Sequence, residues 1–291
     1  MKVAVAQVGS VPFDSQATLV RVERLCRAAA SGDASLVVFP EALLGGYPKS
    51  MTFEATAGNR TDEGRELFLR YANAAIYCPG METELLANWA KEWNLHIVIG
   101  VIERDGGTLY CSSLLFSPED GLVAKHRKLA PTPSEPLLWG QGDESNLQVS
   151  ATQIGRVGMA ICWENYMPLY RQFLYEKNVE LWCAPTVDTR EIWQTSMRHI
   201  AYEGRCFVLS ACQYLTKDDW PDDLREAGGT IDGASVIVSP KGEILAGPAS
   251  GEGVIFADIE LDAIQKGKFE LDVAGYYSRP DIFSLHVREK V

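Results

Sequence analysis

The chain has 291 residues, 46% of them hydrophobic, and a formal net charge of -12 at pH 7. This content suffices for a large core, and no linker-like tract or internal repeat divides the chain, so we expect a single domain over residues 1–291. Lysine and arginine form no basic stripe, which argues against a nucleic-acid partner. The sequence also has neither an apolar run long enough for a membrane span nor a signal peptide, so we expect no membrane association and a cytoplasmic location.

Short apolar runs of strand length recur along the chain, and many are rich in Val and Ile. Runs that are apolar throughout are typical of strands buried on both faces. They occupy residues 2–8, 35–39, 95–102, 108–116, 156–161, 179–184, 206–212, 234–238 and 253–259.

Helical patterns lie between several of these runs, with apolar residues spaced three or four apart. They cover residues 17–30, 81–93, 167–177 and 190–202. Strands that alternate with helices indicate an α/β fold. The turn at residues 239–243 separates two late strands as in a hairpin, which predicts a mixed sheet.

Two charged residues follow strand-like runs closely, where ligands gather in open α/β sheets. Glu41 comes two residues after the run 35–39, and it is either a helix-cap or surface residue or a site residue. Lys128 ends a basic run, which could be a solvated charge run. The constrained loop at residues 129–133 instead favours a lysine that is held inward.

Cys162 follows the run 156–161 and is one of seven cysteines. The odd number, without a Cys-x-x-Cys pair, argues against a disulfide framework or a zinc site. Pro168 permits the first turn of a helix, and a thiol near a helix N-terminus would be favoured as thiolate. The alternative is a buried structural cysteine, which is our interpretation of Cys206 and Cys212.

A carboxylate, an ammonium and a thiol can together carry out nucleophilic catalysis. Glu41 would take the thiol proton of Cys162 as general base, and Lys128 would stabilise charge on the substrate atom under attack. The sequence contains no nucleotide-binding glycine loop and no metal motif, so we expect neither a metal nor an organic cofactor.

Three segments in this order resemble the motifs of the nitrilase family, in its nitrilase and cyanide hydratase branch. They are Phe39-Pro40-Glu41-Ala42, His126-Arg127-Lys128-Leu129 and Cys162-Trp163-Glu164-Asn165. The segment Trp139-Gly140-Gln141-Gly142-Asp143 also follows the lysine motif at the family's spacing, and the likeness covers nearly the whole chain. The resemblance implies an α/β fold of the carbon-nitrogen hydrolase type, a four-layer α-β-β-α sandwich with mixed sheets.

The resemblance also implies roles for individual residues. It predicts a catalytic triad of Glu41, Lys128 and Cys162, with Glu135 as a second glutamate in the loop after the lysine. Four further residues are expected around the substrate, namely Tyr47, Thr132, Trp139 and Trp163.

The form Cys-Trp-Glu resembles that of true nitrilases and cyanide hydratases. We expect a nitrilase, which hydrolyses a nitrile to a carboxylic acid and ammonia through a thioimidate and a thioester. An amidase or a cyanide hydratase or dihydratase could use the same residues, and some amide product is possible. Two other classes remain open, namely a Cys-His hydrolase with His199 as base and a non-catalytic scaffold or sensor. Relatives form dimers and larger assemblies, so we expect at least a homodimer.

Overall fold

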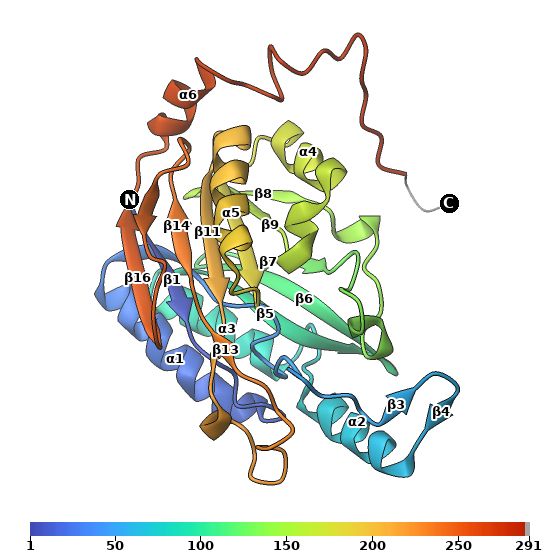
Figure 1. Ribbon diagram of the computed structural model, residues 1–291. Coiled ribbons are helices and arrows are strands. Elements are labelled where there is room, and N and C mark those ends of the chain that lie inside the picture. Colours follow the sequence, from blue (N-terminus) through green and yellow to red (C-terminus); the bar gives the residue numbers. More distant parts are fainter. Residues whose placement is uncertain (289–291) are drawn as a thin grey trace.

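Two six-stranded sheets form the centre of the computed structural model, which describes residues 1–288 (Figure 1). In the first sheet β1, β2 and β5 run parallel and the other neighbours are antiparallel, so the sheet is mixed as predicted. Its strands, in spatial order, are β16 (Gly253–Asp258), β1 (Lys2–Gln7), β2 (Ala34–Val38), β5 (His96–Asp105), β6 (Thr108–Ser117) and β7 (Gly121–Arg127).

The second sheet is also mixed, with β9, β10 and β11 parallel in its middle. Its strands, in spatial order, are β15 (Ile244–Ala246), β14 (Val236–Val238), β11 (Phe207–Cys212), β10 (Leu181–Thr186), β9 (Gly155–Met159) and β8 (Val149–Thr152).

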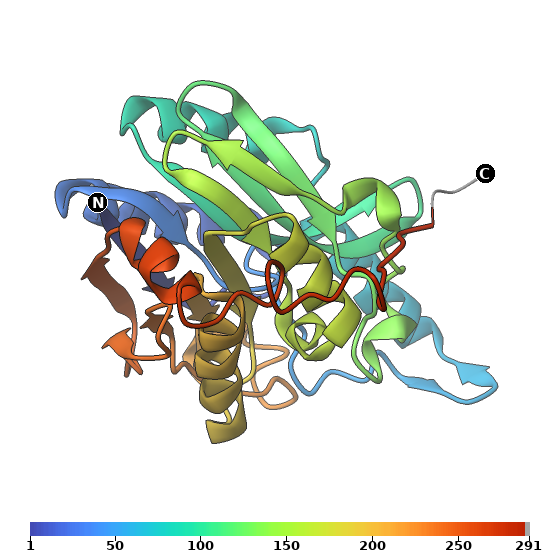
Figure 2. The same ribbon diagram turned by 90° about the horizontal axis from the view of Figure 1, so that it is seen from above.

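The two sheets pack face to face, and helices cover their outer faces (Figure 2). Because successive strand residues point to opposite faces, β1 sends Val3 and Val5 into the core between the sheets and Ala4 and Ala6 toward the helices. The helices of the first sheet are α1 (Ser15–Ser31) and α3 (Met81–Glu92); those of the second are α4 (Pro168–Glu176) and α5 (Glu191–Gly204). The predicted four-layer α-β-β-α sandwich is therefore confirmed.

The remaining elements lie at the ends and edges of the sandwich. Helix α6 (Asp262–Lys268) precedes the C-terminal segment, which crosses the face formed by α4 and α5. Val273 and Leu285 of this segment pack against the core beneath these two helices. No helix within residues 1–288 is long and apolar enough to cross a bilayer. The elements at the ends and edges of the sandwich are two helices, two small hairpins and four 3-10 helices. They are α2 (Asp62–Ala74), α6 (Asp262–Lys268), the hairpins β3 (Ala55–Thr56) with β4 (Asn59–Arg60) and β12 (Tyr214–Leu215) with β13 (Ile231–Asp232), and η1 (Glu135–Leu137), η2 (Glu144–Asn146), η3 (Cys162–Tyr166) and η4 (Lys217–Asp219).

All nine predicted strands and four predicted helices are present, and the turn at residues 239–243 joins the antiparallel strands β14 and β15. The sequence analysis missed α2, α6, β7, β8 and the short strands β3, β4, β12 and β13. Strand β7 was missed because polar residues alternate with apolar ones at its carboxyl end, where the run of charges hides the strand pattern.

Candidate active site

Glu41, Lys128 and Cys162 lie at the carboxyl ends of three strands. Glu41 follows β2 and Lys128 follows β7, both in the first sheet, whereas Cys162 follows β9 in the second. The three residues are 0%, 0% and 3% exposed. The face-to-face packing of the sheets therefore places these ends at one buried position, although the residues are far apart in the sequence.

Lys128 points inward because it continues the alternation of β7. Ala124 and His126 are buried on the same side, whereas Lys125 and Arg127 point outward and form ion pairs with Glu103. The interpretation of this basic run as a solvated charge run is therefore wrong for Lys128. Its ammonium donates hydrogen bonds to the carboxylates of Glu41 and Glu135.

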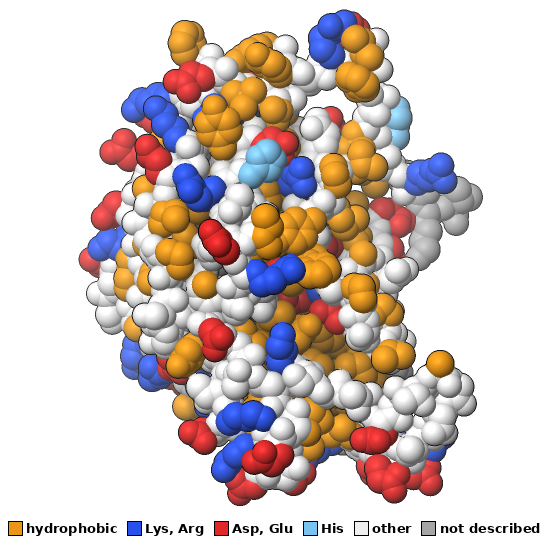
Figure 3. Space-filling model, in the orientation of Figure 1, with side chains coloured by type: hydrophobic (Ala, Val, Ile, Leu, Met, Phe, Trp, Pro, Cys, Tyr) orange, Lys and Arg blue, Asp and Glu red, His pale blue; other side chains and the backbone are white. Residues whose placement is uncertain are grey.

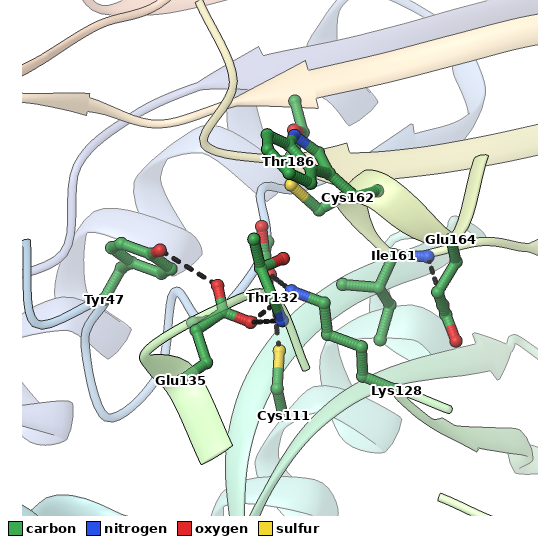
Figure 4. Close-up of polar contacts among 12 residues, drawn as sticks. Tyr47, Cys111, Lys128, Thr132, Glu135, Ile161, Cys162, Glu164 and Thr186 are labelled. Atoms are coloured by element: carbon green, nitrogen blue, oxygen red, sulfur yellow. Dashed lines mark hydrogen bonds and ion pairs between the residues drawn. The ribbon is translucent and has the colours of Figure 1, made fainter. Parts of the chain in front are cut away.

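Glu135 begins η1 in the loop after the lysine, and the structure places it beside Lys128 (Figure 4). Its Oε2 accepts hydrogen bonds from Lys128 Nζ at 2.8 Å and from the Thr132 backbone N–H at 2.6 Å. Its Oε1 accepts a hydrogen bond from the Tyr47 hydroxyl at 2.9 Å. These contacts fix the carboxylate on one side of the ammonium.

Glu41 holds the other side of the ammonium. Its Oε1 accepts a hydrogen bond from Lys128 Nζ at 2.7 Å, and the Cys111 thiol lies 3.7 Å from the same oxygen. Burial raises the pKa of the Glu41 carboxyl, against the lowering effects of Lys128 and of a hydrogen bond with Cys162. Oε2 has no hydrogen-bond partner among the described residues, so this oxygen is available to accept a proton.

Lys128 carries its charge although it is fully buried. Burial by itself lowers the pKa of the ammonium, but Glu41 and the other acidic groups around it raise the pKa well above its ordinary value. Trp139 lies behind it, with the ammonium 5.7 Å from the indole ring centroid. A fixed positive charge is therefore available beside the thiol.

Cys162 has a left-handed backbone, with φ +50°, at the start of η3. Thr186 donates a hydrogen bond from its hydroxyl to Sγ, with the two atoms 3.3 Å apart. Burial raises the pKa of the thiol, and the negative charge of Glu41 raises it further. Burial therefore acts against the thiolate that a helix N-terminus would favour, and helix α4 begins only at Pro168, six residues after Cys162.

A cavity of about 190 Å³ opens beside Cys162. Three of the four residues predicted to surround the substrate line it: Tyr47, Thr132 and Trp163. The fourth, Trp139, is buried behind Lys128 and borders the neighbouring cavity on the other side of Glu135. The full lining is Tyr47, Lys49, Thr132, Glu135, Cys162, Trp163, Val187, Asp188, Thr189 and Arg190.

Asp188 lines the cavity and was missed by the sequence analysis. It accepts hydrogen bonds from Trp163 Nε1 at 2.9 Å and from the Arg190 guanidinium at 2.5 and 2.8 Å. It lies two residues after β10, so the rule that led to Glu41 could have found it. The sequence analysis also missed Cys111 and Thr186 as site residues. Both belong to strands rather than to the residues that follow a strand, so the same rule could not find them.

His199, the alternative catalytic base, does not line the cavity. Its side chain is 59% exposed on α5, and Nε2 lies 3.5 Å from Glu203 of the same helix. The Cys-His interpretation has no support from this arrangement. Within residues 1–288, no group of three or more His, Cys, Asp or Glu side chains could hold a metal ion.

The chain belongs to the carbon-nitrogen hydrolase family, because the family model described as "Carbon-nitrogen hydrolase" matches residues 2–269. It is 50% identical over 296 residues to an aliphatic nitrilase of Sinorhizobium fredii, covering 99% of this chain and 96% of that protein. It is 47% identical over 301 residues to the bifunctional nitrilase/nitrile hydratase NIT4A of Nicotiana tabacum, covering 99% and 86%. The C. elegans NitFhit protein has the same fold, with a TM-score of 0.78 at 21% identity over 100% of this chain and 68% of that one. These matches confirm the family that the three motifs predicted.

Proposed function

We propose that this protein is a nitrilase, which hydrolyses an organic nitrile to the carboxylic acid and ammonia. The observation that carries the proposal is the buried ammonium of Lys128 between Glu41 and Glu135, beside the Cys162 thiol at a cavity. Relatives of similar length that are about half identical bear nitrilase names, which supports a nitrile as substrate.

The first half of the reaction is addition of the thiol to the nitrile carbon. Glu41 takes the Cys162 proton through its free oxygen, and the sulfur attacks the carbon to form a thioimidate. The former nitrile nitrogen gains charge in this step, and the Lys128 ammonium stabilises it. Since Lys128 is held by two carboxylates, it needs no reorganisation when the charge develops.

The second half of the reaction removes nitrogen and then sulfur. One water adds to the thioimidate, and ammonia leaves as the thioester forms; a second water then cleaves the thioester to the acid and the thiol. If the tetrahedral intermediate expels the Cys162 sulfur instead of ammonia, the product is an amide. Glu135 positions the substrate or assists proton transfer, and Tyr47, Thr132 and Trp163 surround it, with Trp139 behind them.

Replacement of the nucleophile tests the proposal. Cys162→Ala should abolish ammonia release while the melting temperature changes little, because the missing sulfur is the attacking atom. Cys78→Ala is the matched control, since that half-buried thiol lies outside the cavity. Retained turnover in Cys162→Ala would reject the mechanism.

An amidase or a cyanide hydratase or dihydratase is the second candidate, because the same residues would serve it and one relative is named for both nitrilase and hydratase activity. A panel of nitriles, amides and cyanide, with acid, amide and ammonia measured separately, decides between them. A nitrilase gives acid and ammonia from a nitrile, whereas a hydratase gives amide alone. A non-catalytic sensor would turn over none of these compounds.

We also propose that the protein works in the cytoplasm as a homodimer or a larger homo-oligomer. All seven cysteines are unpaired, which suits a reducing compartment. The assembly is supported by large apolar side chains that are exposed on α4, on α5 and in the C-terminal segment, including Leu169, Tyr202 and Phe283. Hydrophobic side chains gather on this face of the molecule (Figure 3). Sedimentation velocity at several protein concentrations tests it, and a monomer at every concentration would contradict it.

A further inference from the structure

Glu164 is a buried carboxylate that the proposed mechanism does not use. Its side chain is fully buried, two residues after Cys162. A buried carboxylate without partners is costly, so its hydrogen bonds define what it does in the fold.

All the partners of Glu164 belong to the two segments that carry Lys128 and Cys162. The backbone N–H of Leu129, directly after Lys128, donates to Oε1 at 2.6 Å. The backbone N–H of Ile161, directly before Cys162, donates to Oε2 at 2.7 Å (Figure 4). His126 Nε2 lies 2.9 Å from Oε2 and 3.1 Å from Oε1.

This carboxylate therefore joins the ends of strands from different sheets. Leu129 follows β7 in the first sheet, and Ile161 follows β9 in the second. Each carboxylate oxygen accepts one of these backbone N–H groups, so a change in the distance between the two segments would break a charge-assisted hydrogen bond. His126 is held in turn by the Tyr170 ring, which stacks on it with centroids 5.4 Å apart.

We propose that Glu164 is a positioning residue that sets the distance between the Cys162 sulfur and the Lys128 ammonium. The inference rests on the proposed function, since it concerns the geometry of that reaction. Small displacements of reacting groups have large effects on rate, whereas binding of the substrate depends on the other walls of the cavity. Loss of Glu164 should therefore lower kcat far more than it raises KM.

The test is Glu164→Gln, which preserves shape but replaces one accepting oxygen with an NH₂ group that cannot accept an N–H. We expect kcat for a nitrile to fall at least about 100-fold while KM changes less than about threefold. The matched control is Glu103→Gln, because Glu103 is equally buried and accepts bonds from Ser112, Lys125 and Arg127, away from the cavity. A similar loss of kcat in both variants would overturn the proposal.

A second measurement separates this proposal from the proposed function. The rate of Cys162 alkylation by iodoacetamide, followed by mass spectrometry of the Cys162 peptide, reports thiol activation without a nitrile. Slower alkylation in Glu164→Gln than in Glu103→Gln supports positioning even if no nitrile is turned over, and equal rates contradict it. If Glu164→Gln does not fold, His126→Phe removes one donor, and an unchanged kcat and alkylation rate would then overturn the proposal.

A different observation, on the lining of the Cys162 cavity, carries a second inference. Lys49 lines the Cys162 cavity, and its ammonium has no carboxylate partner among the residues that the structure describes. Its backbone carbonyl accepts a hydrogen bond from Gly229 at 2.8 Å, and Gly229 leaves no room for a side chain against the Lys49 stem. The other cation of the lining, Arg190, is neutralised by Asp188. Lys49 thus supplies an unpaired charge in a fixed part of the wall.

The geometry points to nitriles that carry an anionic group, such as a carboxylate, as the substrate class, with Lys49 as the group that selects them. This inference also rests on the proposed function. A cation on the wall favours the binding of a negatively charged substituent over a neutral one of the same shape. Screening by solvent reduces this difference in binding free energy. The selectivity should therefore be modest and should weaken at high salt.

The test compares 4-cyanobutanoate with its methyl ester. Lys49→Met should raise the ratio of KM for the anion to KM for the ester about fivefold, whereas Lys91→Met, an exposed lysine on α3, should leave the ratio unchanged. An unchanged ratio in Lys49→Met would overturn the inference. The degree to which each nitrile protects Cys162 from iodoacetamide measures binding without turnover. If this protection depends on the charge of the nitrile but no nitrile is hydrolysed, the result counts against the nitrilase proposal and not against the inference about Lys49.

Discussion

Glu41 and Cys162 are both buried, and burial raises the pKa of each side chain. The raised pKa keeps the thiol protonated at neutral pH, so in the proposed mechanism Glu41 must remove its proton during attack. Glu41 can act as base only when it is ionised. As the pH falls through the raised pKa of Glu41, the base is lost, so the acid limb of the activity profile reports this carboxyl.

We predict that the acid limb of kcat/KM lies above pH 4.5, the ordinary pKa of a glutamate. The measurement is kcat/KM for a nitrile from pH 4 to pH 9, at pH values where the protein stays folded. Glu41→Gln should lower kcat by at least about 100-fold across this range, because the proton acceptor is gone. An acid limb at or below pH 4.5, or an active Glu41→Gln variant, would show that another group removes the proton.

Lys128 compensates two buried carboxylates, so its removal should affect stability as well as rate. Lys128→Met leaves Glu41 and Glu135 without their cation, and breaking a buried ion pair on one side costs about 3–5 kcal/mol. Lys125→Met is the control: its partner Glu103 keeps Arg127, so the loss should stay at or below about 1 kcal/mol. Urea denaturation measures both, and similar losses would mean that Lys128 is not the essential counterion.

At the scale of elements, β5 supports the turn that carries Glu41. Gly100 of β5 passes so close to this turn that an added Cβ would lie 2.4 Å from the Pro40 carbonyl oxygen and 2.6 Å from Glu41 Cα. Gly100→Ala should therefore displace Glu41, with a loss of about 1–3 kcal/mol in unfolding free energy and at least about tenfold in kcat. Gly107→Ala, in the exposed turn between β5 and β6, has open space around it and should change neither. Equal behaviour of the two variants in thermal unfolding and assay would contradict this account.

Strand periodicity decided how much of the fold could be predicted. Long apolar runs such as residues 95–102 and 206–212 can be recognised as strands from the sequence, because both faces of these strands are buried. Strand β7 is half-buried and ends in charged residues, so its alternation was overlooked, and with it the reason why Lys128 points inward. The apolar runs placed Glu41 and Cys162 at strand ends. Lys128 was favoured by the constrained loop that follows it and by the family motif, and Glu135 came only from the family resemblance.

The partners of the site residues could not be predicted, since they come from distant parts of the chain. Cys111 approaches Glu41 from β6, and Thr186 reaches Cys162 from β10. Nothing in the sequence around either residue indicates which strand lies beside it. The same limit applied to the pKa of the Cys162 thiol. Its local position suggested a helix dipole, but burial by distant parts of the chain is the largest influence and raises the pKa.

For the whole molecule, the site depends on how the two sheets pack, because Glu41 and Lys128 come from one sheet and Cys162 from the other. The side chains between the sheets, including Val98 and Leu209, therefore set the separation of the proposed base and the proposed nucleophile. The side chains between the first sheet and helices α1 and α3, including Leu86 of α3, stabilise the fold without lying between these residues. Loss of packing in the two layers should have different effects on catalysis.

We predict that Leu209→Ala and Leu86→Ala destabilise the protein to a similar extent, about 2–5 kcal/mol each, since both leucines are fully buried. Only Leu209→Ala should lower kcat among molecules that remain folded, by about tenfold, because the sheets can shift relative to one another there. Urea denaturation gives the stabilities, and kcat is measured at a temperature where both variants are folded. An equal kcat in the two variants would mean that the strand ends hold the catalytic residues without help from the core between the sheets.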